Sequence, residues 1–539
     1  MSSTRDVSGS AEFQVDRREL LKLGAGAVGM AALGSAPAAA AQEGGRKQSA
    51  PGQPRNPART YGFSGPGYQY PQTGRLGNNG PMDDTTAKVV KFVHQFDAAQ
   101  MSPAAVHAFN RTMIDSAASI VASFEEEATR AAARVSRLSP PGKEKCTILG
   151  YGIETTPEVA TFANGVLIRD VDFNDMSPEG SHVSTLIPAA MAMGEALHKS
   201  GADVMAAITV GYELAAVPAG GESVIAAMVA GKLMGLDEDR LANALTMALT
   251  PHIALNKGVG ALGMWKGVRS AESAKCGVWA AMLARDGMTG PPQPFEGRGG
   301  FWANQYGRGG GGNEGGGGLQ ANGMGREFTL PKRSDSLAIQ RNWFKRRPSE
   351  ASSQGLLYMM PEIRAWIKNP DDLASLHWDN PNWEEICDAP KWDPHNRETA
   401  DHSMPYILAR AILEGDIYLD SFTEAKYRDP AALAIMNKTT MSNVDEWSGN
   451  GPGRLTLVKK SGETKYFDTY GGKRNLELAD YPPMTEEELT NKFNRACAYK
   501  KVTNAQRDQA YKAWSNVSAA KDFADVMKTM ATFGQPRPL

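Results

Sequence analysis

The stretch that decides the fold lies between residues 225 and 236, where the chain reads Ile225-Ala226-Ala227-Met228-Val229-Ala230-Gly231-Lys232-Leu233-Met234-Gly235-Leu236. Side chains this small let helices approach one another closely. The same density of Ala, Gly, Met and Leu extends from about Pro188 to Met288, so we expect a tightly packed helical core. Asp237-Glu238-Asp239 follows and places carboxylates at the positive end of the next helix.

Helical patterning begins well before this core. Ser102-Pro103 combines a favourable N-cap with a proline at the first helical position. The apolar residues that follow recur at steps of three and four and mark one face of a helix, namely Val106, Phe109, Met113, Ala117 and Ile120.

The character of the sequence changes after about Asn342. Residues 454–458 and 464–467 are strand-like and flank Lys460-Ser461-Gly462-Glu463, which predicts a β-hairpin. Helix returns at Thr485, where Glu488 completes a capping box.

This order predicts a mainly α fold with an α+β insertion. A large all-helical domain would comprise residues 84–340 and 482–535, and a smaller α+β lid domain would comprise residues 341–481. Such a discontinuous architecture has a cleft between its parts, where we expect the active site.

The N-terminus resembles a Tat-type signal peptide over residues 1–41. The pair Arg17-Arg18 precedes a short Gly/Ala-rich apolar run, and small residues lead to an expected cleavage near Ala41. We therefore predict contact with the Tat export machinery and a periplasmic or secreted protein. The run is too short for a membrane anchor. Residues 42–83 are rich in Gly and Pro and predict an extended arm.

Composition excludes several classes of protein. The 539-residue chain has a net charge of −2, so no overall field favours nucleic acid. Its four cysteines form no CxxC and no metal-ligand pattern, and we expect no metal and no cofactor. The glycine-rich run 307–318 matches a dinucleotide fingerprint only trivially, since no strand precedes it; we expect a surface loop.

The richest polar cluster is Asp172-Phe173-Asn174-Asp175, followed by Ser181-His182. Two carboxylates, an amide and an imidazole can orient a hydroxy acid and move its protons. The alternative to a catalytic cluster is a solvated turn before the next helix. A calcium loop is excluded, because Ser177 and Val183 stand where glycine and glutamate are required.

Cations near the core are candidates for binding carboxylates. Lys266 and Arg269 follow the small-residue region, although both could be surface charges at a helix start. A basic run is formed by Arg341, Lys345, Arg346 and Arg347. Such runs are often solvated faces, but this one also suits a ligand with several carboxylates.

Three further residues complete the candidate site. Glu350 follows the basic run, and His402 and Tyr406 lie four residues apart at the start of a helix. At that spacing both side chains can project from one helical face into a cleft.

These clusters, in this order, resemble the MmgE/PrpD family over roughly residues 84–535, and its 2-methylcitrate dehydratase branch in particular. The most specific stretch runs from Met247–Leu255 through Met264–Gly267 to Arg285–Pro291 and Phe295–Gly297. Asp172–Asp175, Thr399–Tyr406 and Tyr481–Thr485 also resemble family signatures. The resemblance implies a helical domain, a lid domain, a homodimer and no metal.

The resemblance also implies a site. Asp172, His182, Lys266 and Tyr406 fall on active-site positions of the related cis-aconitate decarboxylases. Glu350 falls where those enzymes have a further catalytic histidine and where dehydratases are acidic. We expect metal-independent dehydration of a small β-hydroxy di- or tricarboxylate similar to 2-methylcitrate.

The chain departs from the family pattern in three places. Met176 and Ser352 replace a usual threonine and histidine, and the segment 215–224 is short and lacks a histidine that relatives carry. Two alternatives therefore stay open. One is an epimerase or isomerase acting by α-proton removal, and the other is a non-catalytic periplasmic protein that binds polycarboxylates.

Overall fold

The helical part is organised around two helices in very close contact, α9 (Glu222–Met234) and α11 (Trp265–Arg285). An ideal Cβ at Gly277 would lie 2.3 Å from the carbonyl oxygen of Ser223. Only a residue without a side chain allows the two backbones to approach so closely. The described part of the small-residue region is thus a tightly packed helical core, as predicted.

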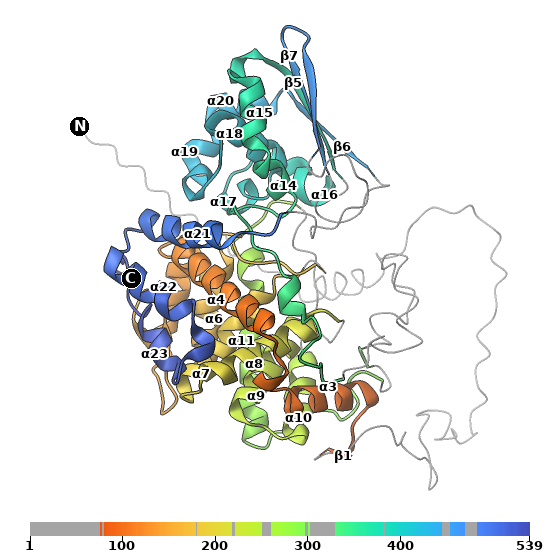
Figure 1. Ribbon diagram of the computed structural model, residues 1–539, viewed down its shortest axis with the longest axis vertical. Coiled ribbons are helices and arrows are strands. Elements are labelled where there is room, and N and C mark those ends of the chain that lie inside the picture. Colours follow the sequence, from red (N-terminus) through yellow and green to blue (C-terminus); the bar gives the residue numbers. More distant parts are fainter. Residues whose placement is uncertain are drawn as a thin grey trace, which may run out of the picture. The chain divides into compact units, whose positions relative to one another are not determined.

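The other helices of this part pack around that pair (Figure 1). Ser102 caps α4 and Pro103 opens it, as predicted. Asp237 caps α10, and acidic residues fill its first turn. The helices are α3 (Asp84–Gln95), α4 (Pro103–Ser123), α5 (Glu127–Ser136), α6 (Pro157–Arg169), α7 (Ile187–Ala196), α8 (Gly201–Ala215) and α10 (Glu238–Leu249).

A separate hydrophobic cluster forms the α+β part. Its four-stranded sheet has the order β6-β5-β7-β8, with β5 parallel to β6 and antiparallel to β7. The predicted hairpin is β7–β8. The strands are β5 (Leu373–Asn380), β6 (Thr439–Asn443), β7 (Arg454–Lys459) and β8 (Thr464–Asp468). Short antiparallel pairs also join β1 (Leu76–Gly77) to β2 (Gly80–Pro81) and β3 (Cys146–Ile148) to β4 (Ile153–Thr155).

Apolar residues of β5 and β7, such as Trp378 and Leu457, share this second cluster with helices α15, α18 and α20. Figure 1 shows these helices beside the sheet. The helices of this part are α14 (Ser353–Tyr358), α15 (Met360–Ile367), α16 (Trp383–Cys387), α17 (Arg397–Ala400), α18 (Met404–Glu414), α19 (Glu424–Tyr427) and α20 (Pro430–Met436). The fold is therefore mainly α with an α+β part.

The chain then returns to the helical core. Helix α21 (Glu486–Tyr499) begins with the predicted capping box, packs on α4 and is followed by α22 (Asn504–Trp514) and α23 (Phe523–Lys528). Lys492 on α21 is buried and donates to Asp115 Oδ1 at 2.5 Å. It also donates to the carbonyl oxygens of Phe173 at 2.6 Å and Lys345 at 2.9 Å. One ammonium thus holds together two segments that are distant in sequence.

A short backbone bridge joins the same two segments. The N–H of Met176 donates to the carbonyl of Trp343 at 2.9 Å, and the N–H of Trp343 donates back at 3.0 Å. Asp172 and Lys345 are thereby brought face to face.

The computed structural model describes residues 76–77, 80–178, 181–217, 221–250, 260–296, 300–301, 329–380, 383–444, 453–468 and 482–539. These residues all belong to one compact unit, Gln69–Leu539. Within them, no helix is long and apolar enough to cross a membrane. The predicted signal peptide, most of the arm 42–83 and the glycine-rich run 307–318 lie outside the described residues. The predicted domain boundaries stay predictions.

The contact between α9 and α11 can be tested with Gly277→Ala. We expect a loss of about 1–3 kcal/mol in the free energy of unfolding, because the new methyl group collides with the backbone near Ser223. Urea unfolding would measure it. Gly142→Ala is the control, since no atom lies within 4 Å of a Cβ there. Equal stability of the two variants would contradict the proposed packing.

Candidate active site

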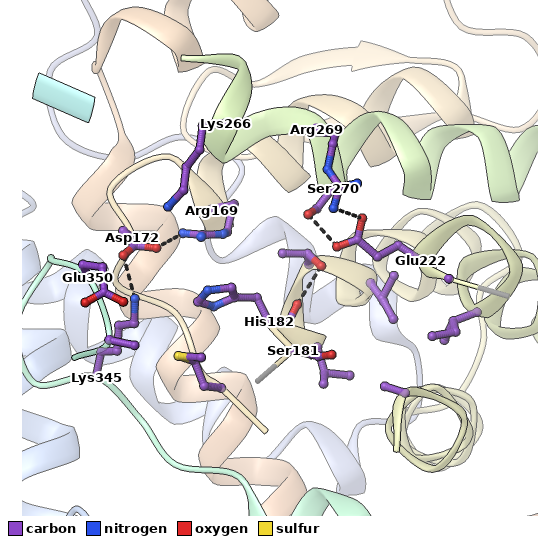
Figure 2. Close-up of a pocket in the computed structure, with 18 of the residues that line it drawn as sticks. Arg169, Asp172, Ser181, His182, Glu222, Lys266, Arg269, Ser270, Lys345 and Glu350 are labelled. Carbon is purple, nitrogen blue, oxygen red and sulfur yellow. Dashed lines mark hydrogen bonds and ion pairs between the residues drawn. The ribbon is translucent and has the colours of Figure 1, made fainter. Parts of the chain in front are cut away.

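A cavity of about 460 Å³ is lined by residues of the helical core together with Lys345, Glu350, Glu385 and His402 from later in the chain. The predicted site residues that line it are Asp172, His182, Lys266, Arg269, Lys345, Glu350 and His402. Figure 2 shows how the labelled ones face one another. Pocket residues from helices α6, α9 and α11 thus meet others that lie more than a hundred positions away in the sequence.

Asp172 joins two cations at one end of the cavity. Its Oδ1 accepts a hydrogen bond from Arg169, and its Oδ2 accepts one from Lys345 Nζ at 2.7 Å (Figure 2). The three side chains are at most 3% exposed. Asp172 also has a positive φ of 52°, a conformation that costs energy for a residue other than glycine.

The cations decide the protonation of Asp172. Burial alone would raise the pKa of this carboxyl, but Arg169, Lys345 and Lys266 together hold it well below its usual range. Asp172 is therefore ionised, and its two oxygens are used by cations rather than being available as a base.

His182 is the neutral imidazole of the site. Its Nδ1 lies 2.9 Å from the carbonyl oxygen of Asp175. A carbonyl can only accept, so Nδ1 carries the hydrogen and Nε2 has a free lone pair. Burial and the charges of Arg169 and Lys345 hold the pKa of His182 well below its usual value. Nε2 can therefore accept a proton.

Lys266 contacts a second histidine. Its Nζ is in hydrogen-bond contact with His402 Nε2, and Asp401 Oδ1 is in hydrogen-bond contact with His402 Nδ1. Burial lowers the pKa of Lys266 to about 7 and raises that of Asp401 to about 7. Burial and the neighbouring Lys266 also lower the pKa of His402 well below its usual value. Lys266 can therefore exchange a proton near neutral pH.

Glu350 is a second group that titrates near neutrality. Burial raises its pKa to about 6, although Lys345 opposes the shift. Its Oε2 accepts from the backbone N–H of Ser352 at 2.6 Å. Protonated Glu350 can act as an acid toward a bound substrate.

The remaining predicted residues do not line the cavity. Tyr406 is buried in the α+β cluster and donates to the carbonyl of Ser421. Arg341 is exposed at the end of a 3₁₀ turn, and Arg347 donates to Asp416 at 2.7 Å. Asn174 donates to Ser184 at 2.8 Å. No described contact supports substrate binding by these side chains.

Asp175 has a structural role behind His182. Its Oδ1 accepts from the N–H of Ser184 at 3.0 Å, and its Oδ2 accepts from Tyr212 at 2.7 Å and Asn342 at 2.8 Å. These bonds fix the backbone carbonyl that holds the imidazole.

Sequence reasoning missed three residues of the site. Arg169 lines the cavity and pairs with Asp172, Glu222 pairs with Arg269 at 3.4 Å, and Asp401 contacts His402. An arginine that ends an apolar helix three residues before an acid was a usable signal for Arg169. No local pattern distinguishes Glu222. Among the residues that the structure describes, no group of three His, Cys, Asp or Glu side chains could hold a metal ion.

A cavity that combines buried cations with neutral histidines and near-neutral acids has the composition of an enzyme active site for small anions. The MmgE/PrpD N-terminal domain matches residues 87–309, and the MmgE/PrpD C-terminal domain matches residues 348–516. This chain belongs to the MmgE/PrpD family, whose members are enzymes of the lyase and dehydratase type. The resemblance to the MmgE/PrpD family inferred from the motifs is thus confirmed.

Named relatives support an enzymatic role. The cis-aconitate decarboxylase-like protein oryM of Aspergillus oryzae is 23% identical over 496 residues, covering 84% of this chain and 97% of the relative. The cis-aconitate decarboxylase of Homo sapiens is 24% identical over 417 residues, covering 69% of this chain and 78% of the relative.

The lowered pKa of Lys266 can be tested through stability. Between pH 7 and pH 10 the unfolded chain keeps this proton while the native state releases it, so stability rises with pH through this window. Lys266→Met lacks the rise. We expect the stability of the wild type relative to this variant to increase by at most about 1.4 kcal/mol per pH unit.

Urea unfolding at several pH values would measure this difference. Lys145→Met is the control, because that side chain is 58% exposed. A pH-independent difference between wild type and Lys266→Met would show that Lys266 keeps an ordinary pKa.

Proposed function

We propose that this protein is a lyase that eliminates water from a small β-hydroxy di- or tricarboxylate, such as 2-methylcitrate, without a metal ion. One observation carries the proposal: the neutral His182 lies in the same cavity as two buried cations, Arg169 and Lys345, and the half-buried Lys266. Elimination beside a carboxylate requires a base for the C–H proton and positive charge for the anion that results.

The elimination can be written with these residues. His182 Nε2 takes the proton from the carbon next to a substrate carboxylate. Negative charge then develops on that carboxylate, where Lys266 and Lys345 stabilise it. The electron pair forms the double bond as the C–O bond breaks. Protonated Glu350 or Lys266 gives its proton to the departing hydroxyl, which leaves as water.

Decarboxylation is a second candidate, supported by the relatives named cis-aconitate decarboxylase. In that reaction the C–C bond to one carboxylate breaks, CO₂ leaves and an acid such as Glu350 protonates the carbon. The step needs an acid but no base. Elimination uses the neutral His182 as well as the two near-neutral acids, Lys266 and Glu350.

Product analysis would test both candidates. We would incubate the purified protein with 2-methylcitrate, citrate and cis-aconitate in D₂O and follow the products by NMR and CO₂ release. New double bonds from the hydroxy acids would support dehydration, and CO₂ from cis-aconitate would support decarboxylation. Deuterium exchange without elimination would instead indicate an epimerase or isomerase. Ligand-induced thermal stabilisation with no chemical change would indicate a binding protein.

The base can be tested with His182→Asn. The Asn amide can still donate to the carbonyl of Asp175, so the loop is retained while the base is lost. We expect kcat to fall by roughly 10²–10⁴-fold with a small change in KM. His198→Asn is the control, since this histidine is 70% exposed and pairs with Asp522. An unchanged kcat in His182→Asn would exclude His182 as the base.

Export and assembly remain part of this proposal. The twin arginine Arg17-Arg18 supports passage through the Tat machinery to the periplasm or beyond, and the family resemblance supports a homodimer. Detection of the cleaved protein outside the cytoplasm and its mass in solution would test these two points.

A further inference from the structure

The cavity has two ends of different chemistry. Figure 2 shows Asp172, Lys345 and Glu350 at one end, Glu222, Arg269 and Ser270 at the other, and His182 between them. The first end holds the buried ion pairs described above. The second end is formed by the first turn of α9 and by α11.

Glu222 accepts hydrogen bonds from the polar side chains of the second end. Its Oε1 accepts from Ser270 Oγ at 2.7 Å, and its Oε2 accepts from Arg269 at 3.4 Å. The position of Glu222 in the first turn of α9 also favours its negative charge, because the N-terminal end of a helix is electropositive. The charge of Arg269 is thus balanced within the protein rather than by a substrate.

Apolar residues also line the cavity, and one of them, Ile225, lies one turn after Glu222 on α9. The apolar lining residues are Leu186, Ala215, Val217, Ile225 and Phe301, whereas Ser181, Thr185 and Glu385 are polar. A carboxylate placed here would lose water without gaining a cation, and it would face the like charge of Glu222. An apolar group would instead be removed from water against apolar walls, which is favourable.

We propose that Glu222 is a specificity-determining residue, and that the substrate is a di- or tricarboxylate with an apolar substituent directed at this second end. The inference rests on the proposed function, because it places the carboxylates of the substrate at the end that contains Lys266 and Lys345. Glu222 excludes a further carboxylate from the position next to Arg269.

A matched pair of unreactive ligands would test this. Butane-1,2,4-tricarboxylate and 2-propylsuccinate share a succinate head and differ only in a terminal carboxylate or methyl group. Calorimetry would give Kd for each. We expect the wild type to bind 2-propylsuccinate about tenfold more tightly than the tricarboxylate. The reason is that the terminal carboxylate of the tricarboxylate would be left without a partner in the cavity.

The variant Glu222→Gln should change this preference. Removing the charge frees Arg269, whose buried Nε has no hydrogen-bond partner among the described residues. The tricarboxylate should then gain about tenfold in affinity relative to 2-propylsuccinate. Glu272→Gln is the control, because Glu272 lies on the same helix as Arg269 and pairs with Lys275 at 3.2 Å instead. Its ligand preference should equal that of the wild type.

Two results would overturn the inference. One is equal or reversed affinity of the two ligands for the wild type, which needs no variant to be folded. The other is the same preference in Glu222→Gln as in the wild type. If the wild type binds neither ligand, both this inference and the proposed function are contradicted, because both ligands carry the succinate head.

Discussion

The buried carboxylate of Asp172 is the interaction on which the rest of the site depends. Two cations, Arg169 and Lys345, reach it from segments that are far apart in the chain. Neither cation would be stable when buried without a hydrogen-bond acceptor, because an unpaired buried charge costs several kcal/mol. The ion pairs therefore require the loop after α6 and the segment around Lys345 to meet. Lys492 holds the same two segments from behind, through their backbone carbonyls.

This arrangement also sets the protonation of the neighbouring groups. Burial, together with the positive charge of Arg169 and Lys345, keeps the pKa of His182 low and the imidazole neutral. Burial brings the pKa of Lys266 down to about 7 and that of Glu350 up to about 6. A neutral imidazole and two proton donors with pKa values near neutrality thus arise from the same cause, the enclosure of charges in a small volume.

The positions at which the chain departs from its family have local explanations. Met176 joins a small apolar cluster with Trp343 and Ala351 and forms the backbone bridge to Trp343. Ser352 donates its backbone N–H to Glu350 and so holds the acid in place. Glu222, at the start of α9, lines the cavity and pairs with Arg269.

The sequence by itself determined the helices, their caps and the hairpin, because capping and apolar spacing act between residues a few positions apart, as at Ser102 and Thr485. It also pointed to Asp172, His182 and Lys266 through the family motifs. Only the tertiary structure decided which charges meet. Arg347, a predicted substrate ligand, turns to Asp416, whereas Lys345, two positions earlier, reaches Asp172 across 173 residues of chain. The partner of a buried charge is chosen by packing between distant segments, and no local pattern carries that information.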